Sequence, residues 1–159
     1  MRILLAIDGS TCSDAAVTEV ASRPWPEGSE IKIVSAFQVP VSPTPEVWAL
    51  SSEHFEQMER IVRKQAEAVV NAAAGVVAGR VDKAVRVTTA VLCGSPRAAI
   101  LEESENWKAD LIVLGSHGYG TLQRFLLGSV SQSVVSHAKC SVEVVRCGEA
   151  TNASTVRAA

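Results

Sequence analysis

Short apolar runs alternate along this chain with longer segments in which apolar residues recur every three or four positions. The runs cover residues 2–7, 31–37, 85–92, 111–114 and 141–146 and are rich in Val, Ile and Leu. The continuous apolar run at residues 2–7 is typical of a strand buried on both faces of a parallel sheet, whereas residues 85–92 alternate enough to predict a strand. The periodic segments between them predict amphipathic helices. Five strands that alternate with four helices predict a doubly wound α/β fold under the right-handed crossover rule.

The predicted helices are bounded by residues that favour helix starts and stops. Ser10 or Ser13 can cap the first helix, which Pro24 ends. Ser95 can cap the third helix, with Pro96 at its first position. The second helix, at about residues 53–77, carries an apolar stripe that we expect to face the sheet, made of Phe55, Met58, Val62, Ala66, Val69, Ala73 and Val76.

Two segments lack any regular pattern. Pro40, Pro43 and Pro45 remove backbone donors after the second strand, so a loop is expected there at the carboxyl edge of the sheet. This loop could cover a ligand or form a plain surface connection. Residues 148–159 are small and polar, which predicts a flexible tail behind a single domain of residues 1–147.

Composition and charge narrow the classes of function. The chain has 159 residues, 47% of them apolar, and a net charge of −2 with Lys and Arg spread along it. It therefore offers no basic face for nucleic acid and no polybasic patch for a membrane. No apolar run approaches the roughly 18 residues of a membrane span, so we expect a cytoplasmic protein. In that reducing compartment Cys12, Cys93, Cys140 and Cys147 are expected to be free thiols, because their spacing fits no zinc motif.

The candidate chemistry lies in residues 110–131. A short apolar run ends at Gly115-Ser116-His117-Gly118, and Gly128-Ser129-Val130-Ser131 opens an amphipathic segment. Glycines let backbone amides approach a ligand and permit left-handed dihedrals. A helix that begins near Ser129 adds unpaired N–H groups and the positive end of its dipole, which suits a phosphate chain. An ordinary glycine-capped connection between a strand and a helix would have the same spacing.

Asp8 directly follows the first predicted strand. Open parallel sheets bind ligands outside the carboxyl ends of their strands, at the point where the strand order reverses. The Asp8 carboxylate is therefore placed to accept a hydrogen bond from a ribose hydroxyl. Asp8 could instead act only as a turn former or a helix cap.

Gly115-x-x-Gly118, followed after nine residues by Gly128-Ser129, resembles the ATP-binding signature of the universal stress protein family. The resemblance continues through residues 137–146, and residues 3–10 resemble the first strand of that family. It implies a Rossmann-like sheet of order 3-2-1-4-5 with the site between strands 1 and 4. It also implies ATP and Mg²⁺ as ligands, with these nucleotide-binding residues: Ala6, Asp8, Ala36, Leu114, Gly115, His117, Gly118, Gly128, Ser129, Val130 and Ser131.

The family resemblance also bears on assembly and catalysis. Family members pair through the last strand, which implies a homodimer through Val142, Val144 and Val145 at an exposed sheet edge. Many members carry arginine where this chain has His117. The chain contains no P-loop lysine motif and no nucleophile elbow, which favours a nucleotide-binding signalling module with slow or absent hydrolysis. The alternatives are a weak ATP hydrolase that uses His117 as acid or base, and a dimer that presents surfaces to partners without nucleotide.

Overall fold

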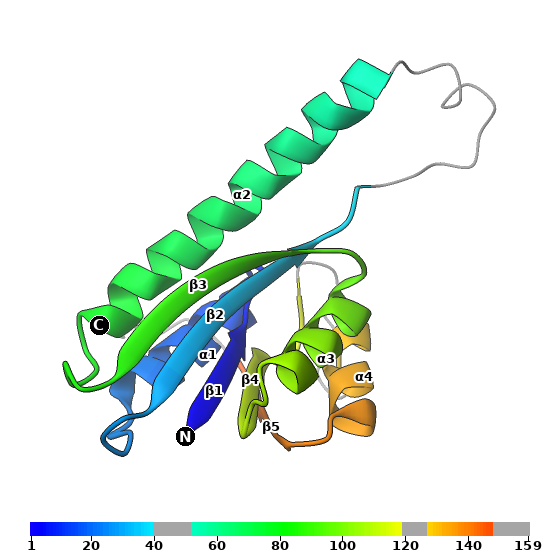
Figure 1. Cartoon of the computed structure of the whole chain (residues 1–159). Coiled ribbons are helices and arrows are strands. Elements are labelled where there is room, and N and C mark those ends of the chain that lie inside the picture. Colours follow the sequence, from blue (N-terminus) through cyan, green and yellow to red (C-terminus); the bar gives the residue numbers. More distant parts are fainter. Residues whose placement is uncertain (40–51, 119–126, 148–159) are drawn as a thin grey trace, which may run out of the picture.

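The computed structural model describes residues 1–39, 52–118 and 127–147 (Figure 1). The predicted loop from Pro40 onward and the predicted tail from residue 148 lie outside these residues. So does the segment 119–126 between the two glycine pairs of the candidate site.

Parallel strands form one sheet in the order β3-β2-β1-β4-β5. In chain order the strands are β1 (Arg2–Ala6), β2 (Glu30–Phe37), β3 (Arg86–Cys93), β4 (Leu111–Gly115) and β5 (Ser141–Val145). β1 lies at the centre, where Leu4 is paired with Lys32 of β2 on one side and with Ile112 of β4 on the other. The predicted α/β class and strand order are both confirmed.

Helices cover both faces of the sheet (Figure 1). They are α1 (Thr11–Ser22), α2 (Ser52–Ala78), α3 (Pro96–Asn106) and α4 (Ser129–His137). Alternate side chains of β1 point to opposite faces, so that Ile3 and Leu5 pack against α1 and α2 while Leu4 packs against α3 and α4. Burial on both faces explains the continuous apolar runs of β1 and β4, whereas the edge strands β3 and β5 are only partly buried. Within the described part of the chain, no helix is long and apolar enough to cross a membrane.

The helix starts follow the predicted capping residues in part. The Ser10 hydroxyl accepts a hydrogen bond from the Ser13 amide at the start of α1, as expected of a capping serine. Ser95 occupies the capping position of α3 and Pro96 begins the helix, but the Ser95 side chain makes no capping hydrogen bond. Gly94 precedes them with a φ of 130°, a conformation that glycine adopts without strain.

The buried stripe of α2 differs from the predicted one. Ala66 and Ala73 are buried as expected, but they share the core with Val70 and Val77, while Val76 is 42% exposed. The sequence contains adjacent valines at 69–70 and 76–77, so that either valine of each pair could face the core. Met58 is 38% exposed because the amino-terminal part of α2 extends beyond the sheet (Figure 1).

The prediction of four free thiols is wrong for two of the cysteines. Cys12 and Cys147 form a disulfide across 135 residues of sequence, with their Cα atoms 4.6 Å apart. Cys12 lies in the first turn of α1, and Cys147 follows β5 at the same end of the sheet. The parallel topology brings these positions together, and spacing along the chain could not show this. Cys93 and Cys140 are free.

Candidate functional site

A cavity of about 300 Å³ opens where β1 and β4 end. The chain leaves β1 to form β2 on one side of it, and β4 lies on the other side, so the strand order reverses at this point. Ligands of open parallel sheets bind at such a reversal, outside the carboxyl ends of the strands. The volume of the cavity is at the lower end of the range for small-molecule sites.

Every predicted site residue lines this cavity, so the structure brings together positions from β1, β2, β4 and α4. Four further lining residues were not predicted from the sequence: Ile7, Ser13, Pro96 and Ile100. Pro96 and Ile100 belong to the first turns of α3, which begins at the same edge of the sheet. The predicted helix start at Ser95-Pro96 could have indicated this wall, because each helix in the described residues follows the carboxyl end of a strand.

The start of α4 is fastened to the end of β4. The Gly128 amide donates to the Ser116 carbonyl oxygen at 2.8 Å, and the Ser131 hydroxyl donates to the same oxygen at 2.9 Å. The Gly128 amide is therefore occupied and is not one of the groups that can hold a ligand. The amides of Ser129, Val130 and Ser131 form the first turn, where no intrahelical acceptor exists. These residues line the cavity, and amides at a helix start are the kind of donor that suits an anion.

The glycines of the site allow the two sides of the cavity to lie close together. A Cβ atom at Gly118 would lie 2.5 Å from Asp8 Oδ2, and a Cβ atom at Gly128 would lie 3.2 Å from the Ser116 carbonyl oxygen. Neither glycine has a positive φ, unlike Gly9 at 85°. The reason for glycine at these two positions is therefore close approach and not a left-handed backbone.

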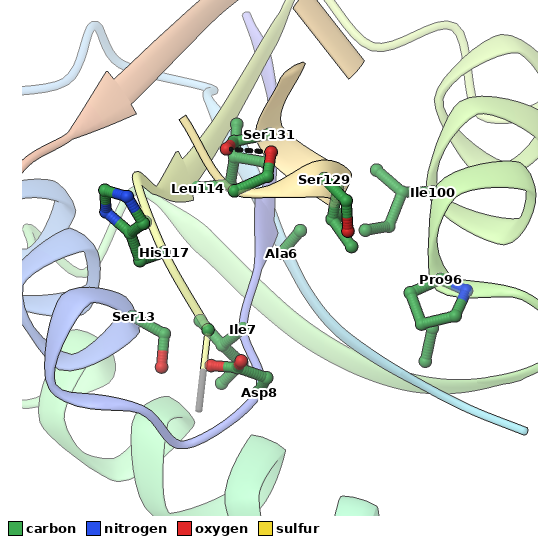
Figure 2. Close-up of a pocket in the computed structure, with 15 residues that line it drawn as sticks. Ala6, Ile7, Asp8, Ser13, Pro96, Ile100, Leu114, His117, Ser129 and Ser131 are labelled. Carbon is green, nitrogen blue, oxygen red and sulfur yellow. Dashed lines mark hydrogen bonds between the residues drawn. The ribbon is translucent and has the colours of Figure 1, made fainter. Parts of the chain in front are cut away.

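Asp8 has a local role and a free oxygen. Its Oδ1 accepts a hydrogen bond from the Ser10 amide at 2.9 Å, which is the turn-forming role considered from the sequence. Its side chain is exposed and reaches the cavity (Figure 2). Among the described lining residues, Asp8 is the only carboxylate. Because Oδ1 is occupied by the Ser10 amide, Oδ2 remains available to accept a hydrogen bond from a ligand hydroxyl.

His117 lines the cavity, but its ring points away from Ser129, Ile100 and Pro96 (Figure 2). The His117 ring Nδ1 lies 3.1 Å from Ser116 Oγ. The backbone carbonyl oxygen of His117 accepts a hydrogen bond from Ser10 Oγ at 3.2 Å. The ring Nε2 is buried without a hydrogen-bond partner in the described part of the chain. In this orientation the imidazole supplies neither a base nor a cation to a ligand in the cavity.

The remaining wall is apolar. Ala6, Leu114 and Ile100 lie on the side away from Asp8 (Figure 2), and Ala36 and Val130 complete this surface. A ligand with an apolar ring, hydroxyl groups and an anionic group would find a matching group for each in this cavity. A nucleotide combines these three kinds of group.

A sequence model of the universal stress protein family matches residues 1–146. The chain belongs to this family. A universal stress protein from Thermus aquaticus is 35% identical over 149 residues, which cover 91% of this chain and 97% of the relative. The solved structure of the universal stress protein UspA from Lactobacillus plantarum is similar, with a TM-score of 0.76 at 26% identity over 92% of this chain and 97% of that one.

Two other solved structures share the fold of this universal stress protein and contain nucleotides. One is a universal stress protein in complex with cAMP, with a TM-score of 0.63 and 22% identity over 93% of this chain and 98% of that one. The other is a family member from Arabidopsis thaliana with AMP bound, with a TM-score of 0.55 and 18% identity over 94% of this chain and 93% of that one.

Proposed function

We propose that this universal stress protein binds ATP together with Mg²⁺ at the ends of β1 and β4, and that it acts through occupancy of this site. The observation that carries the proposal is the first turn of α4, whose amides of Ser129, Val130 and Ser131 line a cavity opposite the Asp8 carboxylate. Solved relatives of the same fold that hold cAMP or AMP support a nucleotide as the ligand class.

The chemistry of the cavity fits each part of the nucleotide. The amides of the first turn of α4 would receive the phosphates, because they are free donors at the positive end of the helix dipole. Asp8 Oδ2 would accept a hydrogen bond from the ribose, and the surface of Ala6, Leu114 and Ile100 would contact the base. Mg²⁺ keeps several waters and bridges substrate phosphates, so it needs few protein ligands.

Slow or absent hydrolysis follows from what lines the described cavity. Neither lysine nor arginine is among the lining residues, and the ring of His117 is turned away (Figure 2). Phosphoryl transfer depends on cations that stabilise the transition state and on a residue that positions water. ATP is therefore proposed as a bound signal rather than a consumed substrate, in a protein that we expect to be cytoplasmic.

We also propose a homodimer through β5. This strand ends the sheet beside β4, and Val142, Val144 and Val145 in it are only partly buried. The outer edge of a terminal strand presents unpaired backbone donors and acceptors, which a second copy can cover.

The test of nucleotide binding compares two glycine substitutions by isothermal titration calorimetry with Mg-ATP. In Gly128→Val a branched side chain meets the Ser116 carbonyl and displaces the start of α4. The amides of Ser129, Val130 and Ser131 then no longer lie where the phosphates would bind. Loss of two or three charge-assisted hydrogen bonds of about 1.5 to 3 kcal/mol each predicts affinity lower by a factor of about a hundred or more. The matched control is Gly75→Ala in α2, where a Cβ atom would meet nothing within 4 Å.

Asp8→Ala should weaken ATP binding less than Gly128→Val, because it removes one ribose contact and leaves the helix amides in place. Mass analysis of the small molecules released from the purified, denatured protein identifies the nucleotide independently. Equal affinity in wild type and Gly128→Val, with both folded by circular dichroism, would place the nucleotide elsewhere and refute the assignment.

A further inference from the structure

The disulfide between Cys12 and Cys147 lies next to Ser116, which stands between two lining residues of the proposed nucleotide site, Gly115 and His117. We propose that these two cysteines are a reversible thiol–disulfide couple that controls the segment Gly115–His117, and through it the affinity for nucleotide. The affinity part of this inference rests on the proposed function. The control of the segment rests on the contacts alone.

Cys12 touches the end of β4 through both its backbone and its sulfur. A Cβ atom at Gly115 would lie 2.7 Å from the Cys12 carbonyl carbon, so the two backbones are in direct contact. The Ser116 hydroxyl donates to Cys12 Sγ at 3.8 Å, and His117 Nδ1 lies 3.1 Å from that hydroxyl. Because Cys12 is only 5% exposed, this contact is enclosed. A change at the sulfur therefore reaches Ser116 and His117 first.

Cys147 holds the same segment from the other side. The Ser116 amide donates to the Val145 carbonyl oxygen at 2.8 Å, and Cys147 follows two residues later. The hydrogen bonds and the disulfide together close a ring that runs from Ser116 to Val145, Cys147, Cys12 and back to Ser116. Reduction opens this ring at the disulfide, its only covalent cross-link between distant parts of the chain. The end of β5 is then joined to α1 only by non-covalent contacts.

The loosened segment also carries groups of the proposed site. The Ser116 carbonyl oxygen accepts hydrogen bonds from the Gly128 amide and the Ser131 hydroxyl, which fix the start of α4. The His117 carbonyl oxygen accepts from Ser10, which caps α1 behind Asp8. The start of α4 and the start of α1, on the two sides of the cavity, are thus hydrogen-bonded to the residues that the disulfide restrains. We expect the oxidised protein to be the form that binds nucleotide more tightly.

The chemistry of the couple balances with a low-molecular-weight disulfide as oxidant. The Cys147 thiolate attacks oxidised glutathione, which forms a mixed disulfide and releases one glutathione. The Cys12 thiolate then attacks the Cys147 sulfur, which forms the protein disulfide and releases the second glutathione. Cys12 is placed for the second step because it lies opposite Cys147, with the two Cα atoms 4.6 Å apart. Protein disulfides in reducing compartments are usually transient or redox-sensing, as expected for such a couple.

The experiment uses the full chain with Cys93→Ser in every sample, because Cys93 is an exposed free thiol. Wild type in this background is compared with Cys147→Ser and with Cys140→Ser. Cys140 is the matched control, since it is half-buried and free, and burial raises the pKa of its thiol. Each protein is equilibrated in glutathione buffers of increasing oxidised fraction. Peptide mass spectrometry measures the Cys12–Cys147 bond, hydrogen exchange measures residues 111–118, and calorimetry measures the dissociation constant of Mg-ATP.

We expect the Cys12–Cys147 bond to form in one transition as the oxidised fraction rises. On reduction, the amides of Gly115 to His117 should exchange faster, and the dissociation constant of Mg-ATP should rise by about two- to tenfold, which corresponds to one or two side chains losing preorganisation. Cys147→Ser should behave as the reduced protein at every buffer composition. Cys140→Ser should follow wild type.

Absence of the Cys12–Cys147 peptide at every oxidised fraction would refute the couple. Equal exchange at residues 115–117 in both redox states would refute control of the segment, and equal ATP affinity in both states would refute control of the site. If neither redox state binds ATP while exchange still depends on the bond, the proposed function fails and the redox control of the segment stands.

Discussion

Gly115 is the site glycine whose missing side chain matters most to folding. A Cβ atom there would lie 2.7 Å from the Cys12 carbonyl carbon and 2.8 Å from the Ser13 amide nitrogen, so that only backbone could move aside. We predict that Gly115→Ala lowers the free energy of unfolding by about 1 to 3 kcal/mol through overpacking.

Gly75→Ala is the matched substitution and should raise the free energy of unfolding by about 0.4 to 1 kcal/mol, because Gly75 lies within α2 with open space around it. Urea titration of the two variants beside wild type measures both effects. A Gly115→Ala protein as stable as wild type would show that β4 and α1 can separate at little cost.

The sequence predicted the residues around the cavity better than it predicted their roles. Glycine at 118 and 128 was expected for dihedral freedom or for ligand approach, and the structure assigns both to close packing of the chain against itself. The occupied amide of Gly128 could not be foreseen, because its acceptor on Ser116 is set by the tertiary position of β4.

At the scale of elements, α1 and β5 are joined at both ends of their contact. One end is the disulfide, and the other is Arg23, whose guanidinium lies 2.7 Å from Glu143 Oε2 and 2.8 Å from Glu19 Oε1. The hydrogen bond to Glu143, and then that to Glu19, raise the pKa of Arg23. A guanidinium with a raised pKa stays charged throughout the physiological range, so the link should persist at every pH at which the carboxylates are ionised.

We predict that Arg23→Ala lowers the free energy of unfolding by about 1 kcal/mol. The reason is that the partly buried Arg23–Glu143 ion pair, with two hydrogen bonds, contributes more stability than an exposed ion pair does. Arg60→Ala is the control. Arg60 pairs with Glu56 on α2 with both side chains mostly exposed, and its loss should cost about 0.5 kcal/mol or less. Thermal unfolding of the two variants under the same conditions compares them, and equal shifts would argue against a special role for the α1–β5 link.

The β5 edge makes a separate prediction. If a second copy covers this strand, the protein at micromolar concentration should have twice the mass of one chain by light scattering. The amides on the outer edge of β5 should then be protected from hydrogen exchange. A single-chain mass together with fast exchange along β5 would contradict the dimer.

Element order and helix starts could be predicted because each depends on local pattern, whereas the strand order was predicted only from the resemblance to the universal stress protein family. The register of α2 could not, since valines at 69–70 and 76–77 satisfy either of two stripes and packing against α1 and the sheet selects Val70 and Val77. The Cys12–Cys147 bond also escaped prediction. Its partners are 135 residues apart, and only the completed sheet places them side by side.

For the whole molecule, the proposed function predicts a nucleotide that is held but hardly consumed. Purified protein with Mg-ATP should release phosphate far more slowly than the usual enzyme range of about 1 per second or more. A coupled phosphate assay with His117→Ala as a control tests this, because the ring faces away from the cavity and its loss should leave the rate unchanged (Figure 2). Turnover within the enzyme range that disappears in His117→Ala would instead support an ATP hydrolase.

Because α2 is longer than the strands beneath it, its two ends should differ in how readily they unfold locally. Its 27 residues span about 40 Å, whereas the eight residues of β2 or β3 span about 26 Å, so part of the helix has no sheet beneath it (Figure 1). In that part, pairs four residues apart such as Glu56 with Arg60 contribute only a few tenths of a kcal/mol each. Buried Ala66, Val70 and Val77 secure the rest.

A helix end without tertiary packing is only marginally stable in water, so it should open and close many times for each global unfolding event. Amides of residues 56–62 should then exchange at least about ten times faster than those of residues 66–77, a gap of about 1.4 kcal/mol in opening free energy. Added salt should widen this difference, because it screens the ion pairs and leaves the buried stripe untouched. Uniform exchange along α2 would mean that its amino-terminal turns unfold only with the whole domain.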